Sequence, residues 1–348
     1  MLLLVLSDLH LMPEIRTSGT VLTGDCEYAI SQLKPYMTQF DPEAVIIAGD
    51  IFDQPLVSNE ELKLFRMLCD VLDTGRPRKK LCIQGNHDPG RWAIPDICFG
   101  CCDIDQGPVD IQGVRIGGVK YRAEAAEMKK RIAERSKLCD IVVTHASTMP
   151  FANFNAKLVP DDFPDGKFCI VGDTHLTRFY NRHGKRILSP GYLYPTRKNE
   201  FFSDGPGAVL LKIDGPEQLD KIAVYELPLQ RRFAADALNG WPDDSVISQL
   251  REHENDALAP IVYVEKDSVR DVTAALPFVV PVRAVRPKKQ DPEKVRISGN
   301  PRESVIGKLR EASYTVLRDN PDKDMIVTMI EDLWNTNDPE KYLTERIG

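Results

Sequence analysis

Short runs of apolar residues alternate with longer amphipathic segments over the first two hundred or so residues of the chain. The runs are rich in Val, Ile and Leu, which is typical of strands buried on both faces of a sheet. We expect strands at Leu2–Leu6, Ala44–Ala48, Lys80–Ile83, Val114–Val119, Asp140–Thr144, Phe168–Val171, Arg186–Leu188 and Ala208–Ile213. The segments between them favour helices at Glu27–Phe40, Asn59–Asp73 and Glu124–Leu138. This alternation predicts a layered α/β domain.

The pattern changes after Pro228. Residues 230–257 are mostly polar and predict a connecting segment with one helix, and a strand–helix–strand unit follows at Ile261–Val264, Ser268–Leu276 and Phe278–Val285. That unit is too small to bury much core alone, so we expect it to pack on the first domain. Two further helices are expected at Arg302–Leu317 and Lys323–Leu333. We therefore predict three parts, at residues 1–228, 229–296 and 297–348.

Composition narrows the class of protein. Hydrophobic residues make up 42% and charged residues 28% of the 348 positions, which excludes a wholly disordered or collagen-like chain. No run approaches about 18 apolar residues and no secretory leader is visible, so we expect no membrane span and a cytoplasmic protein. The eight cysteines lie mainly in apolar surroundings and predict buried thiols rather than a disulfide framework. The net charge of -7 argues against a nucleic-acid partner, because such proteins usually carry a basic surface.

Four of the six histidines come directly after an expected strand, each beside carboxylate or amide groups. The five strand ends that carry such groups are Asp8-Leu9-His10, Gly49-Asp50-Ile51-Phe52-Asp53, Gly85-Asn86-His87-Asp88, Thr144-His145 and Gly172-Asp173-Thr174-His175. In a mostly parallel sheet these ends lie on one edge, so we expect the side chains to converge. Carboxylate, imidazole and amide donors suit a divalent metal, and their number exceeds the needs of one ion. A single Asp or His here would more simply cap a turn or fill the core, but five such strand ends together favour a metal site.

These motifs, in this order, resemble those of the calcineurin-like metallophosphoesterase superfamily. Within it, the first three motifs and Ser189-Pro190-Gly191 are similar to the SbcD-type nuclease component of DNA double-strand-break repair and recombination complexes, including relatives in tailed phages. The resemblance implies a layered α/β sandwich of two β-sheets flanked by helices. It also implies a small α/β capping domain and C-terminal helices that dock on an SMC-like ATPase of the SbcC type.

The resemblance implies two metal sites that share one carboxylate. One ion would be held by Asp8, His10, Asp50 and His175, and the other by Asp50, Asn86, His145 and Asp173. The family usually has histidine where this chain has Asp173. A carboxylate there makes the site harder and more anionic, which favours Mn²⁺, with Mg²⁺ as the alternative. It also leaves open a weaker second site.

His87 is the expected catalytic side chain that is not a ligand. It would donate a proton to the leaving oxygen or stabilise the charge on phosphorus, with Asp53 or Asp88 orienting its ring. The alternative for both carboxylates is that they cap turns.

Contacts with DNA require positive charge near the metals. The candidates downstream of the last motif are Arg178, Arg182, Lys185, Arg186, Arg197 and Lys198, and a solvated charged face is the alternative. Tyr121, Tyr192 and Tyr194 are left open between stacking on bases and packing.

We therefore expect a divalent-metal-dependent DNA exonuclease or endonuclease, working as a homodimer with an SMC-like ATPase in the cytoplasm (the host's, if the chain is phage-encoded). Two bound ions would add four positive charges where phosphate sits, so the acidic net charge does not exclude DNA. Two alternatives remain: a phosphatase or small-molecule phosphodiesterase, and a catalytically weakened DNA-binding scaffold.

Overall fold

The structure is a computed structural model that describes residues 1–17, 20–54, 57–88, 101–151, 156–202, 207–215, 218, 221–237, 241–264 and 268–283. The chain divides into two compact units, residues 1–285 and 286–348. The second unit lies outside the described residues, and so do both helices expected near the C-terminus.

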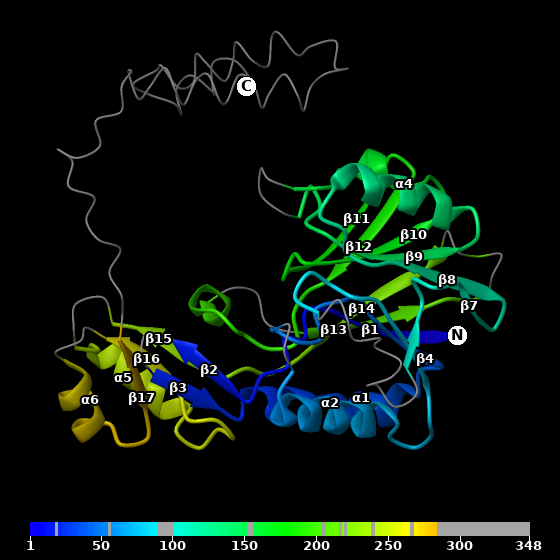
Figure 1. The fold of residues 1–348 in the computed structure, drawn as a ribbon. Helices are drawn as coiled ribbons and strands as arrows, with labels where there is room; N and C mark the ends of the chain where they lie inside the picture. Colours follow the sequence, from blue (N-terminus) through cyan, green and yellow to red (C-terminus); the bar gives the residue numbers. More distant parts are fainter. Residues whose placement is uncertain are drawn as a thin grey trace, which may run out of the picture. The chain divides into compact units, whose positions relative to one another are not determined.

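Two six-stranded sheets form the first part of the chain (Figure 1). The first sheet pairs, in order, β14 (Ala223–Pro228), β13 (Gly207–Lys212), β1 (Leu2–Leu6), β4 (Ala44–Ile47), β5 (Lys79–Cys82) and β6 (Cys101–Asp103). The second pairs β11 (Thr177–Arg182), β12 (Lys185–Pro190), β10 (Phe168–Gly172), β9 (Ile141–His145), β8 (Val114–Val119) and β7 (Val109–Ile111). Strands β1, β4, β5 and β6 run parallel, as do β8, β9, β10 and β12.

Alternating side chains of the central strands enter two different cores, as a pleated strand requires. On β1, Leu3 and Val5 pack into the core between the two sheets, whereas Leu4 and Leu6 face the outer core beneath the helices. Helices α1 (Asp25–Phe40) and α2 (Asn59–Leu72) cover that outer face, and α4 (Ala125–Ser136) covers the outer face of the second sheet (Figure 1). The two-faced burial explains why these strands are continuously apolar, and it confirms the layered α/β sandwich.

Most expected elements are present within one to three residues of their predicted ends. Helix α2 begins where expected, because Ser58 accepts a hydrogen bond from the Glu61 backbone while the Glu61 carboxylate accepts one from the Ser58 backbone. The elements that sequence analysis missed are short or exposed: the hairpin of β2 (Glu14–Thr17) and β3 (Thr20–Thr23), strands β6, β7, β11 and β14, and the 3₁₀ helices η1 (Pro160–Asp162) and η2 (Lys198–Phe202).

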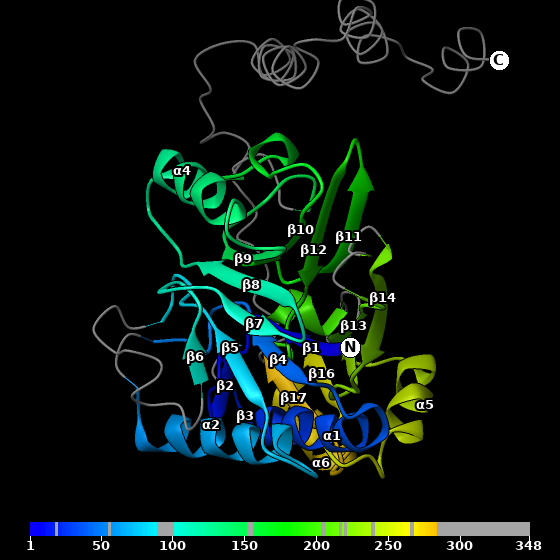
Figure 2. The ribbon, with the colours of Figure 1, turned by 90° about the vertical axis from the view of Figure 1, so that its right-hand side faces the viewer.

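A smaller three-stranded parallel sheet follows. It pairs β15 (Ala234–Asp236), β16 (Ile261–Val264) and β17 (Val280–Arg283), with helices α5 (Asp244–Glu252) and α6 (Val269–Ala275) (Figure 1). Figure 2 shows α5, α6, β16 and β17 from a second direction. The prediction for residues 230–257 was wrong in one respect, because this segment supplies strand β15 as well as the expected helix. With three residues, the strand is too short to show a period of apolar positions.

The small sheet shares a core with the first domain, as expected. Ile261, Tyr263 and Val282 pack in the same cluster as residues of α1 and α2. Arg232, just before β15, forms a buried two-pronged ion pair with Asp25 at the start of α1, with N–O distances of 3.0 and 2.9 Å. The boundaries at residues 228 and 296 stay predictions.

Two further expectations concern the whole chain. All seven cysteines in the described part are free, and six of them are buried. Among the described helices, none is both long and apolar enough to cross a bilayer.

Candidate metal centre

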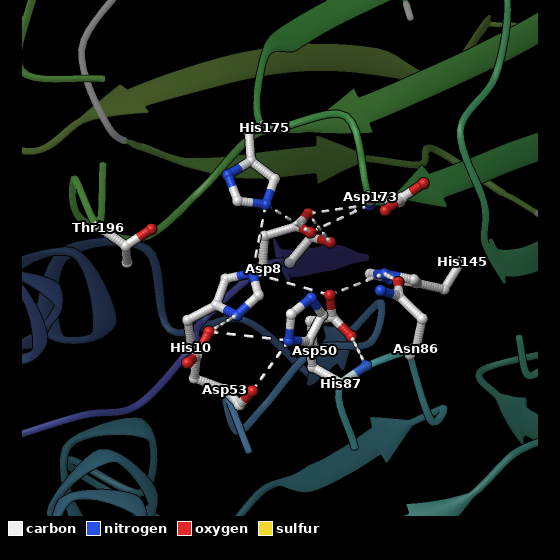
Figure 3. Close-up of polar contacts among 12 residues, drawn as sticks. Asp8, His10, Asp50, Asp53, Asn86, His87, His145, Asp173, His175 and Thr196 are labelled. Atoms are coloured by element: carbon white, nitrogen blue, oxygen red, sulfur yellow. Dashed lines mark hydrogen bonds and ion pairs between the residues drawn. The ribbon is translucent and has the colours of Figure 1, made fainter. Parts of the chain in front are cut away.

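The predicted side chains come together where strands of both sheets end (Figure 3). The loops after β1, β4 and β5 carry Asp8, His10, Asp50, Asp53, Asn86 and His87, and the ends of β9 and β10 carry His145, Asp173 and His175. The first two loops lie side by side, because the His10 N–H donates to the Asp50 carbonyl at 2.9 Å. The loops converge as expected, but they come from the strands of two sheets and not from one edge of a single sheet.

One donor group consists of Asp8, His10 and His175. The Nε2 atoms of the two histidines are 3.2 Å apart, and His175 Nε2 is 3.4 Å from Asp8 Oδ1. Asp8 is held in place by the Ser7 hydroxyl, which donates to its Oδ2 at 2.6 Å. Asp8 and His10 are each no more than 2% exposed, so these donors are withdrawn from bulk water.

A second donor group consists of Asp8, Asp50 and His145. His145 is fully buried, and its Nε2 lies 3.1 Å from Asp50 Oδ2 and 3.0 Å from Asn86 Oδ1. Burial acts to lower the pKa of the His145 imidazole, but the Asp50 carboxylate outweighs it and raises that pKa to about 10. Burial likewise acts to raise the pKa of Asp50, and His145 outweighs it and lowers that pKa to about 2.

The hydrogen bonding of His145 shows what this second group can bind. Its Nδ1 is 2.7 Å from the Ala48 carbonyl oxygen, which can only accept, so Nδ1 carries a proton. In the neutral ring Nε2 then holds a lone pair, and it faces two oxygens that are also acceptors. Such a cluster requires a cation between its members, either a proton or a metal. The residues therefore fit a divalent ion bound by imidazole, carboxylate and amide oxygen.

The third group, His10, Asp53 and His87, joins the expected catalytic histidine to the first donor group. His87 Nδ1 is 2.9 Å from the Asp53 carbonyl oxygen and 3.7 Å from its carboxylate, and Asp53 Oδ1 is 3.3 Å from His10 Nδ1. The His10 imidazole beside it holds the pKa of Asp53 below its usual range. Asp53 therefore lies between the rings of His10 and His87.

Asp88 takes a different position from the one expected of a residue that orients His87. Its Oδ1 accepts the backbone N–H groups of Ile51 and Phe52 at 2.9 and 3.1 Å, and its Oδ2 accepts that of Gly85 at 2.8 Å. Burial raises the pKa of Asp88 to about 6. These contacts favour the turn-capping alternative, in which Asp88 fastens the loop after β4 to the loop after β5.

The backbone at the site is strained. Of eight non-glycine residues with positive φ in the described chain, five belong to the predicted ligand set: Asp8, His10, Asp50, Asp173 and His175. This region of φ disfavours side chains, and it persists where the surrounding structure enforces it, as at functional sites. Close packing adds a second constraint, because a Cβ on Gly85 would overlap the Asp50 carboxylate.

Asp173 is the one carboxylate among the predicted ligands whose side chain joins none of the three groups. Its backbone N–H instead donates to both oxygens of Asp8, at 3.1 and 3.2 Å (Figure 3). Burial raises the pKa of its carboxyl group. The position where the family usually has histidine thus supports Asp8 through the backbone.

The basic residues expected to contact DNA fall into two classes. Arg178, Arg182 and Arg197 are exposed. Lys185 is engaged, with Nζ 2.8 Å from Asp165 and 2.6 Å from the Phe163 carbonyl. Arg186 is 8% exposed and lies over the Phe168 ring, so its burial does not favour the expected contact with a phosphate. The side chain of Lys198 lies outside the described part.

The segment after β12 supports the site in a way that sequence analysis missed. The Tyr194 hydroxyl donates to the His10 carbonyl at 2.6 Å and accepts from the Met12 N–H at 3.1 Å. Tyr192 and Tyr194 are each 2% exposed, which decides for packing over base stacking. Glu200 Oε1 lies 2.8 Å from His175 Nδ1. The only sequence signal was a cluster of aromatic and charged residues after the last motif.

The His175–Glu200 pair shifts both groups toward their charged forms. Burial acts to lower the pKa of His175, but the hydrogen bond to Glu200 outweighs it and raises that pKa. Burial acts to raise the pKa of Glu200, and the same hydrogen bond outweighs it and lowers that pKa.

Comparison with known proteins finds relatives of this chain. The DNA double-strand break repair protein Mre11 of Aeropyrum pernix is 25% identical over 271 residues, which cover 67% of this chain and 65% of that protein, slightly under two thirds of its length. The SbcD component of the nuclease SbcCD of Staphylococcus epidermidis is 31% identical over 71 residues, 20% of this chain and 19% of that protein.

Among solved structures, TT1561 of Thermus thermophilus covers 65% of this chain and 98% of its own, with 14% identity and a TM-score of 0.40. The phosphoesterase YfcE of E. coli covers 66% of this chain and 100% of its own, with 15% identity and a TM-score of 0.36. The family model of the calcineurin-like phosphoesterases matches residues 1–177, which contain every predicted ligand. Since that match covers just over half of the 348 residues, the chain belongs to the calcineurin-like phosphoesterase family.

Proposed function

We propose that this protein hydrolyses phosphodiester bonds of DNA with two divalent metal ions. One observation carries the two-ion centre: Asp50 Oδ2 lies between the donor groups, 3.1 Å from His145 Nε2 and 3.7 Å from His10 Nε2. A single carboxylate oxygen shared by two sets of donors is what a bridged pair of ions requires.

The ligand assignment is the one that the family resemblance implies, and the distances among the histidines and Asp8 and Asp50 support it. Asp8, His10, Asp50 and His175 would hold one ion, and Asp50, Asn86 and His145, with Asp173, would hold the other. Such ions, when bound, lower the pKa of water and neutralise charge on the phosphate. The oxygen-rich second set favours Mn²⁺ or Mg²⁺. With the Asp173 carboxylate outside the donor groups, the second ion is expected to be the more weakly held.

His87 would act on the substrate rather than on the ions. The Asp53 carbonyl fixes the proton on His87 Nδ1, which leaves Nε2 as the reacting atom. In the doubly protonated ring, Nε2 donates a proton to the leaving oxygen or a hydrogen bond to the charged phosphate. Asp53, 3.7 Å from Nδ1, stabilises that positive charge. His87 is also half-exposed, as a group that meets substrate must be.

DNA is proposed as the substrate because the two relatives are named for DNA break repair and for nuclease activity. The exposed Arg178, Arg182 and Arg197 lie downstream of the last motif and would contact phosphates. The net charge of -7 does not oppose this, because two bound ions would add four positive charges where phosphate sits.

A digestion assay tests the proposal. Linear DNA and a nitrophenyl phosphodiester are each incubated with the full chain, with Mn²⁺ and with a chelator. Metal-dependent loss of DNA supports the nuclease. Hydrolysis of the small diester alone would instead indicate the small-molecule phosphodiesterase, and binding of DNA with fewer than two ions and no cleavage would indicate the weakened scaffold.

The partner is proposed on the same basis. We propose an SMC-like ATPase that contacts the C-terminal segment, residues 297–348, for which the sequence predicts helices, together with a homodimer of this chain in the cytoplasm. Co-purification of an SbcC-type ATPase with the full chain, and its loss on truncation before Pro301, would support the docking. Retention of the ATPase by the truncated chain would contradict it.

A further inference from the structure

Glu200 is a buried carboxylate that the ligand assignment does not use. It lies in η2 and is 4% exposed, and its Oε1 accepts a hydrogen bond from His175 Nδ1 at 2.8 Å. With Nδ1 protonated toward Glu200, the lone pair of His175 is on Nε2, which faces Asp8 Oδ1 and His10 Nε2. Glu200 thus selects the tautomer that can bind a cation.

The second oxygen of Glu200 is equally fixed. Its Oε2 accepts from the Thr196 N–H at 2.7 Å, from the Thr196 hydroxyl at 3.1 Å and from the Arg197 N–H at 3.1 Å. Three donors hold the carboxylate in one orientation, so the His175 ring has one preferred position. A rigid support of this kind is what tunes a histidine ligand.

The backbone of Glu200 is tied to the segment between the two sheets and the small domain. Its carbonyl oxygen accepts from the Tyr192 hydroxyl at 3.0 Å and from Arg231 Nη1 at 2.7 Å. The neighbouring Arg232 is anchored by the buried ion pair with Asp25. A continuous chain of contacts therefore runs from His175 to the strand that opens the small domain.

We propose that Glu200 is a positioning residue for His175 and that Arg231 couples this support to the small domain. The inference rests on the proposed metal centre. It predicts that Glu200 acts on one ion only, the one held by Asp8, His10 and His175.

Calorimetric titration of the metal-free full chain with Mn²⁺ tests whether Glu200 positions His175. Glu200→Gln should weaken one of the two ions about 10–100-fold and leave the other unchanged. Glu200→Asp, which keeps the charge, should recover part of the affinity. Glu226→Gln, at an exposed position of β14, is the matched control and should bind as wild type.

A double-mutant cycle separates positioning from general support of the fold. The second variant is His175→Gln, which keeps a donor atom for the ion but has no ring Nδ1 facing Glu200. If Glu200 acts through His175, Glu200→Gln should have no further effect on Mn²⁺ affinity in the His175→Gln background. An equal loss in both backgrounds would overturn the proposal, as would wild-type binding by Glu200→Gln. A wild-type chain that takes up no Mn²⁺ would refute the metal centre itself, which distinguishes the two failures.

Arg231→Met tests whether Arg231 couples Glu200 to the small domain. Arg251→Met, at an exposed position of α5, is the control. Arg231→Met should weaken the same ion, by less than Glu200→Gln does, because Tyr192 still holds the Glu200 carbonyl. Unchanged affinities for both ions would overturn the coupling to the small domain.

Discussion

The Nε2 atoms of His10 and His175 lie 3.2 Å apart although the two residues are 165 positions apart in the chain. Each ring has a carboxylate at its other nitrogen, Asp53 at 3.3 Å from His10 Nδ1 and Glu200 at 2.8 Å from His175 Nδ1. The Nε2 atoms of the two rings face each other, and each Nδ1 atom faces a carboxylate. A cation can therefore bind between the two Nε2 atoms. Their pairing links the start of the family match to its end.

Removal of one of these rings should remove one ion. His175→Ala is expected to bind one Mn²⁺ per chain where the wild type binds two, and to lose DNA cleavage. Metal content after gel filtration measures this directly. His183→Ala, at an exposed turn between β11 and β12, is the control and should keep both ions. Two ions in His175→Ala would show that the ring is not a ligand.

His87 should separate catalysis from metal binding. His87→Ala is expected to keep both ions and to lose about 10²–10⁴-fold in cleavage rate, the usual contribution of a positioned acid–base group. The rate is measured on linear DNA with saturating Mn²⁺, beside a count of bound metal. Wild-type cleavage by this variant would exclude the proposed role.

Variants of Asp173 test whether a carboxylate serves as a metal ligand at the position where the family usually has histidine. Asp173→Ala should weaken the second ion, and Asp173→His should hold it at least as tightly as the wild type, because imidazole is the family's usual donor there. Titration with Mn²⁺ reports both. If Asp173→Ala binds two ions with wild-type affinities, the carboxylate is not a ligand and the contribution of this residue is its backbone N–H to Asp8.

Sequence predicted this site better than its surroundings, for a physical reason. Asp8 and Asp50 come shortly after strands β1 and β4, and His145 ends strand β9. The apolar runs of these strands mark burial on both faces, so the position of the polar residue at each end was readable. Glu200 and Tyr194 come from a segment without such a run, and they reach His175 and His10 through tertiary packing alone.

Tertiary packing also decides two other features that the sequence did not reveal, the burial of a charged residue and the pairing of a short strand. Nothing in the local sequence distinguishes the buried Arg186 from the exposed Arg182. Arg186 lies over the Phe168 ring of strand β10, which is a neighbour in the sheet and not in the local sequence. Strand β15 has three residues and is recognisable only from its pairing with β16. In these two cases, the feature that was missed depends on a partner distant in sequence.

Asp88 should contribute to stability rather than to the orientation of His87. Asp88→Ala leaves three buried backbone donors without their acceptor, and each such donor costs about 1–3 kcal/mol. We expect a lower midpoint of urea unfolding in the metal-free chain. Asp161→Ala, at an exposed position of η1, should unfold as wild type does. Unchanged unfolding of Asp88→Ala would show that these contacts are dispensable.

The ion pair of Asp25 and Arg232 should fasten the small domain to α1. Both side chains are about 5% exposed or less, and removing one partner of a buried pair leaves an uncompensated charge that costs about 3–5 kcal/mol. Arg232→Met should therefore lower the free energy of unfolding by about that amount. In the double variant Asp25→Leu, Arg232→Met, no buried charge is left unpaired, so much of the loss should be recovered. Additive losses in the double variant would mean that the two residues stabilise the fold independently of each other.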